Sequence, residues 1–204
     1  MNNSDFRQLA LSDVEQAADV ISQAFINDPL CAYMLPYKQT RLTTLRKFFR
    51  AYGEVNISNQ RGYGVCEPLK GVAFWMEPNH TDVSIRVKSL SIFLPLLFTY
   101  YPIGYIRARA ILKQIDHLHQ KYTDGPHYHL DNIGVLPSNQ GEGLSSRLIR
   151  PFLSKADAEK AIVYTDTVTR ANVGLYEHFE FQTMDECPIV GKGITIWALR
   201  RTVQ

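Results

Sequence analysis

Two glycines, Gly141 and Gly143, stand just before a stretch of helical spacing, and two serines follow them. Glycine can adopt left-handed backbone conformations and lets the backbone approach a ligand closely. The first N–H groups of a helix have no intrahelical partner and lie at a positive dipole end, so they bind anions. The segment NIGVLPSNQGEGLSSRLI, residues 132–149, therefore predicts a strand, an anion-binding turn and a helix in that order.

A tyrosine and an asparagine form a second group of residues whose side chains could take part in chemistry. Asn172 and Tyr176 lie four residues apart in a predicted helix, so they share one face. Tyrosine has an ordinary pKa of about 10 and keeps its proton at neutral pH.

Two His-x-His pairs form the third group. His127, His129 and Asp131 alternate along a predicted strand and so face one side. This trio could bind zinc, take a proton from an amine directly or through water, or form a hydrogen-bonded polar face, and the spacing leaves all three open. His117 and His119 lie on a predicted helix, where their rings point apart and make a poor chelate. We expect no metal.

The elements that position these groups follow an α/β order in the second half of the chain. The pattern there predicts strands at 127–135, 161–167 and 193–200 and helices at 143–159 and 170–179. In the first half it predicts a strand at 6–11, a helix from Ser12 to Asp28, a helix at 39–59, and a hairpin with strands 62–66 and 71–76.

A helical insertion separates the two halves. We expect two buried helices, at about 83–99 and 103–122, hinged near Pro102. The window 89–106 carries no charge, but it contains two prolines and is slightly short of the roughly 20 residues that a membrane span needs. A membrane partner is therefore not expected.

Composition bounds the class of protein. With 204 residues and 45% hydrophobic side chains, the chain is expected to form one domain, residues 1–204. A net charge of +2 without a dense basic run argues against a nucleic-acid partner. Three widely spaced cysteines and an N-terminus without a secretion signal favour a cytoplasmic protein.

Two interpretations of the glycine turn as a nucleotide-binding motif fit the sequence poorly. A P-loop needs a lysine before the hydroxyl residue, and the turn has none. A dinucleotide fold would use Gly141, Gly143 and Asp166, but Ser146 stands at the third glycine position and only one more α/β step follows.

The run from Gln140 through Gly141 and Gly143 to Ser145 closely resembles the Gln/Arg-x-x-Gly-x-Gly/Ala pyrophosphate loop of the GNAT superfamily of acyl-CoA-dependent N-acyltransferases. Residues 130–137 resemble its bulged fourth strand, and Asn172-x-x-x-Tyr176 its second signature. Residues 126–130, the strand end at 74–78 and the helical stretch between them resemble, more narrowly, the branch containing puromycin N-acetyltransferase. Ser145 and Glu180 depart from the family's small residues at their positions.

The resemblance implies a GNAT-like mixed, mostly antiparallel sheet flanked by helices, with the insertion between strands three and four. It implies acetyl transfer from acetyl-CoA to a primary amine of a small molecule or peptide. Tyr176 would be the general acid, the Ile133 amide the oxyanion donor, and His129 a candidate base. The resemblance also implies the residues that would bind acetyl-CoA, which are Ile133, Val135, Gln140, Gly141, Gly143, Ser145, Ser146 and Asn172.

A non-catalytic acyl-CoA-binding sensor on the same fold is the alternative function, because the two departures leave it open. The acceptor itself is not specified by the sequence, and a monomer and a homodimer are both compatible with it.

Overall fold

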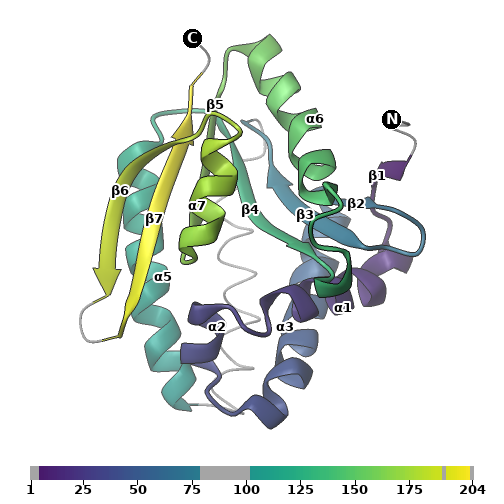
Figure 1. Ribbon diagram of the computed structural model, residues 1–204, viewed down its shortest axis with the longest axis vertical. Helices are drawn as coiled ribbons and strands as arrows, with labels where there is room; N and C mark the ends of the chain where they lie inside the picture. Colours follow the sequence, from purple (N-terminus) through teal and green to yellow (C-terminus); the bar gives the residue numbers. More distant parts are fainter. Residues whose placement is uncertain (1–4, 79–101, 190–191, 203–204) are drawn as a thin grey trace.

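A computed structural model describes residues 5–78, 102–189 and 192–202. Among the described residues, the order of the strands and α-helices matches the expected one apart from an additional helix at Pro29–Met34 and an additional strand at Gln182–Ile189 (Figure 1). The first half contains β1 (Phe6–Gln8), a 3-10 turn η2 (Leu11–Asp13), α1 (Val14–Phe25), α2 (Pro29–Met34), α3 (Lys38–Ser58), β2 (Gly62–Val65) and β3 (Gly71–Met76). The second half contains α5 (Pro102–Tyr122), β4 (His127–Val135), η4 (Pro137–Asn139), α6 (Leu144–Glu159), β5 (Ile162–Thr167), α7 (Arg170–Glu177), β6 (Gln182–Ile189) and β7 (Ile194–Arg201).

All the strands of the described residues form one sheet, in the order β1-β2-β3-β4-β5-β7-β6. Neighbouring strands are antiparallel except β4 and β5, which are parallel. The predicted fold class, a mixed and mostly antiparallel sheet flanked by helices, is therefore confirmed.

The parallel pairing of β4 and β5 is short, so the sheet separates into two halves beyond it. Residues 127–130 of β4 pair with residues 162–165 of β5, but β4 continues for five more residues without pairing to β5. We refer to the point where Leu130 pairs with Thr165, together with the residues that follow on both strands, as the β4–β5 junction. From this junction the two halves of the sheet diverge, with β3 and β4 in one half and β7 and β6 in the other (Figure 1).

Helices cover the two faces of the sheet, and the face of each strand residue follows from its alternation. One face packs on α1 and α3 near β3 and on α5 near β5 and β7. The other face packs on α6 and α7. Because residues on β4 and β5 alternate between these layers, side chains from both faces approach the junction.

Helix α1 begins later and ends earlier than predicted. It starts at Val14 rather than after Ser12, because Asp13 accepts the Ala10 N–H at 2.7 Å and pairs with Arg7 at 2.7 Å. It ends at Phe25. Asp28 then caps a further helix, α2, which the sequence pattern did not predict, because an Asp-Pro pair is also typical of the end of a helix. Proline also suits the first helical position, where its missing N–H costs nothing.

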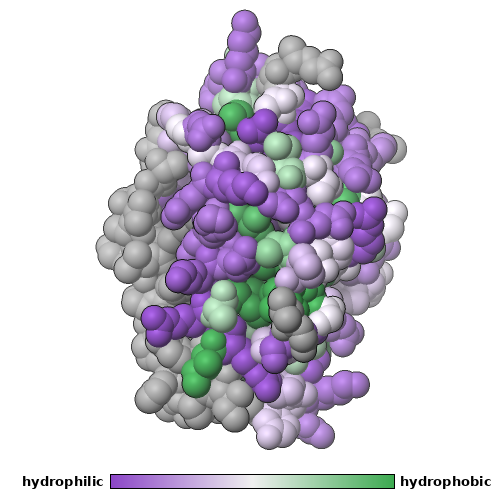
Figure 2. Space-filling model, turned by 90° about the vertical axis from the view of Figure 1, so that its left-hand side faces the viewer, coloured by the Kyte–Doolittle hydropathy of each residue, from purple (hydrophilic) through white to green (hydrophobic). Residues whose placement is uncertain are grey.

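The sequence analysis also missed β6, which lies at the edge of the sheet next to β7. Its sequence, QTMDECPI, mixes acidic residues with Pro188, and proline is tolerated in edge strands. On this side of the molecule hydrophilic residues predominate, with a narrow band of hydrophobic ones (Figure 2). Pairing with β7, rather than hydrophobicity, therefore defines this strand.

The helix predicted at 103–122 is confirmed as α5. The first helix of the expected insertion, at 83–99, lies outside the described residues. Within the described ranges, no helix is long and apolar enough to cross a bilayer. Helix α6 continues unbroken through Pro151, so it tolerates the backbone hydrogen bond that the proline removes.

Candidate acetyl-transfer site

The free edge of β4 presents backbone N–H groups to the junction. The Leu136 N–H donates to the Lys70 carbonyl at 2.8 Å, so this antiparallel pair is hydrogen-bonded. Hydrogen-bonded pairs alternate with non-bonded pairs along an antiparallel ladder. The register therefore turns the N–H groups of Ile133 and Val135 away from β3, toward the side on which β5 has diverged.

A β-bulge lies just before this edge. Phe74 pairs with Asn132 and Trp75 pairs with Leu130, so Asp131 is the extra residue of β4. A bulge re-aims the side chains beside it. Asp131 is also the first residue of β4 beyond the last pair with β5, so its carboxylate stands at the junction.

Tyr176 reaches the junction from α7. Its side chain is buried, and its hydroxyl makes a hydrogen bond with Thr165, which in turn donates to the Leu130 carbonyl at 3.0 Å. Burial raises the pKa of Tyr176 to about 12, with the Asp166 charge adding to the rise and the Thr165 hydrogen bond opposing it. The phenol is therefore fully protonated at neutral pH.

Asn172 lies one turn before Tyr176 and points to the same strand. Its side-chain amide donates to the Thr167 hydroxyl at 3.2 Å, and the residue is exposed. The shared face predicted for the two residues is thus seen in their contacts with β5.

The two glycines of the predicted turn both have a positive φ, +87° for Gly141 and +74° for Gly143. A Cβ added at either position would meet no atom within 4 Å, so the backbone conformation rather than crowding requires glycine there. Gly143 is the N-cap of α6, and as a glycine it has no side chain with which to cap the helix. Its first N–H groups are therefore available to a ligand.

Three polar side chains predicted to bind the ligand surround this helix start. Gln140 is exposed, and Ser145 and Ser146 are half-buried in the first turn of α6. The Ser146 hydroxyl accepts a hydrogen bond from Arg150 Nε at 2.8 Å. The structure thus brings the three residues to the end of α6 that follows the free edge of β4.

A tyrosine that the sequence analysis did not single out completes the junction. Tyr52 of α3 donates its hydroxyl hydrogen to the Asp131 carboxylate and accepts a hydrogen bond from Asn132 Nδ2 at 3.2 Å. Tyr52 is 79 residues from Asp131 in sequence, so no local pattern reveals the contact.

The pKa of the Asp131 carboxyl is unusually high for an aspartate. Burial raises the pKa of this carboxyl to about 7; the neighbouring Asp166 charge adds to the rise and a hydrogen bond from Asn132 opposes it. The proton affinity of Asp131 therefore falls in the physiological range, which is the range suited to a general base.

His119 of α5 contacts both His127 and His129 of β4. His119 Nε2 lies 2.8 Å from His127 Nε2, and the ring of His119 stacks on that of His129 with centroids 4.6 Å apart. His129 is 2% exposed and also contacts the Tyr164 ring. Among the described residues, no group of three or more histidine, cysteine or acidic side chains is arranged to hold a metal ion.

The turn after α7 accommodates the departure at Glu180. This residue has φ +67°, a conformation that favours glycine, which explains the glycine that the resemblance expects there. Arg201 donates to the Glu180 carboxylate at 2.9 Å and anchors it to β7. The departure therefore changes the chemistry of the turn while its backbone keeps the shape that glycine would adopt.

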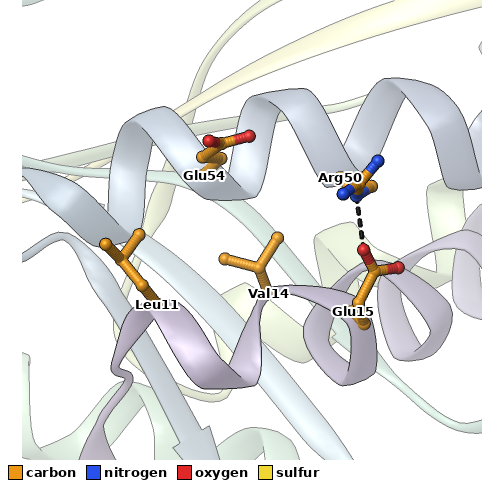
Figure 3. Close-up of a pocket in the computed structure, with 5 residues that line it drawn as sticks. All are labelled: Leu11, Val14, Glu15, Arg50 and Glu54. Atoms are coloured by element: carbon orange, nitrogen blue, oxygen red, sulfur yellow. Dashed lines mark ion pairs between the residues drawn. The ribbon is translucent and has the colours of Figure 1, made fainter.

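A separate surface pocket lies between the start of α1 and α3 (Figure 3). Glu15 and Arg50 form an ion pair at its rim. Its lining, Leu11, Val14, Glu15, Arg50 and Glu54, includes no residue of the β4–β5 junction.

Comparisons with known proteins identify a relative in sequence and several of similar fold. An N-acetyltransferase of Schizosaccharomyces pombe is 22% identical over 197 residues, which cover 86% of this chain and 73% of that protein. Among solved structures, a protein described as histone acetyltransferase HPA2 and related acetyltransferase from Corynebacterium glutamicum superposes with a TM-score of 0.67 at 20% identity, covering 98% of this chain and 96% of that one. Arylalkylamine N-acetyltransferase 2 of Aedes aegypti gives a TM-score of 0.65 at 13% identity, covering 98% of both chains.

The structural similarities show a shared fold. The family assignment rests on the match of the acetyltransferase (GNAT) family model to residues 71–181, more than half of the chain. This match spans β3, the β4–β5 junction, the glycine turn and α7. The protein therefore belongs to the acetyltransferase (GNAT) family.

Proposed function

We propose that the protein transfers an acetyl group from acetyl-CoA to a primary amine of a small molecule or peptide. The observation that carries the proposal is the junction itself. Beyond its pairing with β5, β4 leads to the start of α6, whose N-cap is a glycine, and the buried, protonated Tyr176 reaches the junction from α7. An acyl-CoA offers a matching series of groups, which are an amide-bearing arm, a pyrophosphate and a thioester.

The donor would bind along β4 and α6. The pyrophosphate lies at the N-terminus of α6, where the helix dipole and the first N–H groups favour an anion. Gln140, Ser145 and Ser146 add side-chain donors, and Gly141 and Gly143 keep the backbone accessible. The Val135 N–H pairs with the pantetheine arm, and Asn172 binds it from α7.

The thioester would lie at the junction. The Ile133 N–H donates to the thioester oxygen, on which negative charge develops as the amine attacks. Tyr176 donates its proton to the departing CoA sulfur. Its raised pKa supports this role, because an acid that stays protonated is ready in every catalytic cycle. His129, the base suggested by the sequence, lies on β4 two residues before Asp131.

Primary amines are proposed as acceptors on two grounds. Solved structures of similar fold include proteins named arylalkylamine N-acetyltransferase and polyamine N-acetyltransferase. In this chain two carboxylates, Asp131 and Asp166, interact at the junction, and they would attract a cationic amine. The same charges would favour an ammonium group over a neutral alcohol.

The test is an acceptor screen with purified protein. Acetyl-CoA is expected to raise the melting temperature, because a ligand that binds the folded state stabilises it. At least one amine of a panel of arylalkylamines, polyamines and peptides is expected to release free CoA thiol. Stabilisation by acetyl-CoA without thiol release from any acceptor would support a non-catalytic sensor, and no stabilisation would contradict acyl-CoA binding altogether.

A further inference from the structure

An amine acceptor arrives protonated, because alkylammonium groups have an ordinary pKa of about 10. It must lose a proton before its nitrogen can attack the thioester, so a base is needed next to the junction. The candidates on β4 are the carboxylate of Asp131 and the imidazoles of His127 and His129.

His129 is enclosed by rings. Its ring stacks on that of His119 at 4.6 Å and contacts that of Tyr164 at 5.5 Å, and the residue is 2% exposed. Its position in the strand precedes the last residue that pairs with β5. A substrate nitrogen at the thioester would therefore have to displace this packing to reach the imidazole.

Asp131 is placed differently. It is the first β4 residue beyond the paired segment, and the residue as a whole is half-buried. The bulge opposite Phe74 and Trp75 lets Asp131 and Asn132 contact the same hydroxyl, that of Tyr52. The carboxylate is thus held at the junction by two neighbours.

The ring of Tyr52 is itself fixed by packing. It makes an edge contact with Phe74 at 5.1 Å and a tilted contact with Phe48 at 5.7 Å. The hydroxyl accepts from Asn132 and donates to Asp131, so the three groups form one polarised chain. A rigid donor of this kind orients the carboxylate without occupying both of its oxygens.

We propose that the Asp131 carboxylate takes the proton from the acceptor ammonium, with Tyr52 and Asn132 as positioning residues. The inference rests on the proposed acetyl transfer. The titratable groups that face Asp131 are Tyr52 from α3 and Asp166 from β5, while α5 brings His119 to His129 on the same face. The Asp166 charge and burial both raise the proton affinity of Asp131.

The proton balance is complete without another reactant. One N–H proton of the ammonium passes to Asp131, and the freed lone pair forms the N–C bond to the thioester carbon. The C–S bond then breaks, and the sulfur receives the Tyr176 proton. The second proton of the nitrogen replaces the one that Tyr176 gave, and Asp131 releases its proton to solvent, so the products are the amide, CoA thiol and one proton.

The proposed acid, Tyr176, and the proposed base, Asp131, approach the junction from opposite faces of the sheet. Tyr176 belongs to the α6 and α7 layer, whereas Asp131 contacts α3 in the other layer. The acid and the base therefore do not compete for one position, and the amine can attack the reacting carbon from one side while the sulfur leaves on the other.

The experiment compares the pH dependence of kcat/KM for the wild type and Asp131→Asn with an accepted amine. The wild type is expected to gain activity as pH rises through about 7, the pKa of Asp131. Asp131→Asn is expected to lose this limb and roughly 100-fold in kcat/KM at neutral pH, the contribution typical of a general base. The matched control is Asp124→Asn, an exposed aspartate in the turn before β4, which should behave as wild type.

Two further readouts separate chemistry from misfolding. The deficit of Asp131→Asn should shrink for a fluorinated analogue of the same amine, which is already unprotonated at neutral pH. Tyr52→Phe should fold and shift the limb to higher pH, because the carboxylate loses a hydrogen-bond donor. If Asp131→Asn does not fold, the Tyr52→Phe shift decides, and an unmoved limb overturns the proposal.

The failure of this proposal is distinguishable from that of the proposed function. No thiol release by the wild type with any amine would contradict acetyl transfer itself. A wild type that turns over, with Asp131→Asn retaining its rate and pH limb, overturns the role of Asp131 alone. Loss of the limb in His129→Gln instead would assign the base to the histidine.

Discussion

The hydroxyl of Tyr176 lies where burial and the charge of Asp166 both oppose its ionisation. On the proposed function, replacing Tyr176 by Phe removes the proton donor and leaves the ring in place. We expect kcat to fall roughly 100-fold or more, the usual contribution of a general acid. The thermal stabilisation by acetyl-CoA should remain, and an unchanged rate would remove the assignment of Tyr176 as the acid.

The protonation of Asp131 makes the free energy of unfolding depend on pH. Its pKa is raised from 3.8 to about 7, so between these values the folded state holds a proton that the unfolded state has released. The stabilisation that this bound proton gives to the folded state is therefore fully present below about pH 4 and is lost as pH rises through about 7. The free energy of unfolding falls over this range with a slope of up to about 1.4 kcal/mol per pH unit.

Asp131→Asn should abolish this dependence. Between about pH 5 and pH 8 the wild type should lose on the order of 2 kcal/mol more than the variant in free energy of unfolding. Urea unfolding of both proteins at the two pH values measures the difference. Parallel pH profiles would show that the carboxyl is not perturbed in the folded state.

At the scale of elements, the start of α6 is the feature most open to test. Gly143→Ala places a side chain at φ +74°, which costs about 1–2 kcal/mol in backbone strain. Gly125→Ala, at φ +78° in the turn before β4, carries the same strain, and neither Cβ would meet an atom within 4 Å. The two variants should therefore have similar stability.

Their affinities for acetyl-CoA should differ. We expect a loss of roughly tenfold or more, about 1.4 kcal/mol, for Gly143→Ala and none for Gly125→Ala, because only Gly143 caps the proposed pyrophosphate site. Titration calorimetry with acetyl-CoA measures both. Equal affinities would place the pyrophosphate elsewhere.

Local patterns predicted the elements that carry the site. The glycine turn before α6 and the Asn172–Tyr176 spacing on α7 were visible because backbone conformation and helical periodicity leave marks over a few residues. The narrower resemblance to the puromycin N-acetyltransferase branch stays a prediction. Strand β6 and helix α2 were missed, since edge pairing and a capping aspartate decide them more than hydrophobicity.

The Tyr52–Asp131 contact could not be predicted for a different reason. It depends on a bulge in β4 and on the packing of α3 across the sheet, which join residues 79 positions apart. The strand pattern showed correctly that Asp131 shares a face with His129, but not which of the two stands at the junction. Only the point at which β4 and β5 stop pairing distinguishes them.

At the scale of the whole molecule, a net charge of +2 gives no general attraction for cations. Any preference for a cationic acceptor must therefore come from the local field of Asp131 and Asp166. A carboxylate next to the reacting amine would be repelled by the same field. We expect phenylethylamine to be preferred to phenylalanine by roughly tenfold or more in kcat/KM, about 1.4 kcal/mol.

Phenylalanine methyl ester is the matched control, because it keeps the bulk of the amino acid and removes its negative charge. Steady-state assays should place the ester near the amine. Asp166→Asn should narrow the gap between amine and amino acid, and a gap that the ester shares would indicate steric exclusion instead.

The halves of the sheet are joined at β4 and β5 by only four paired positions, and past them no strand of the described residues pairs with this edge of β4. On the proposed function the pantetheine arm of the donor takes the place of the missing strand there. Free CoA carries the same arm and the same pyrophosphate, so the product completes the sheet nearly as well as the donor does. Turnover would then follow the ratio of acetyl-CoA to CoA in the surroundings rather than the amount of acetyl-CoA alone.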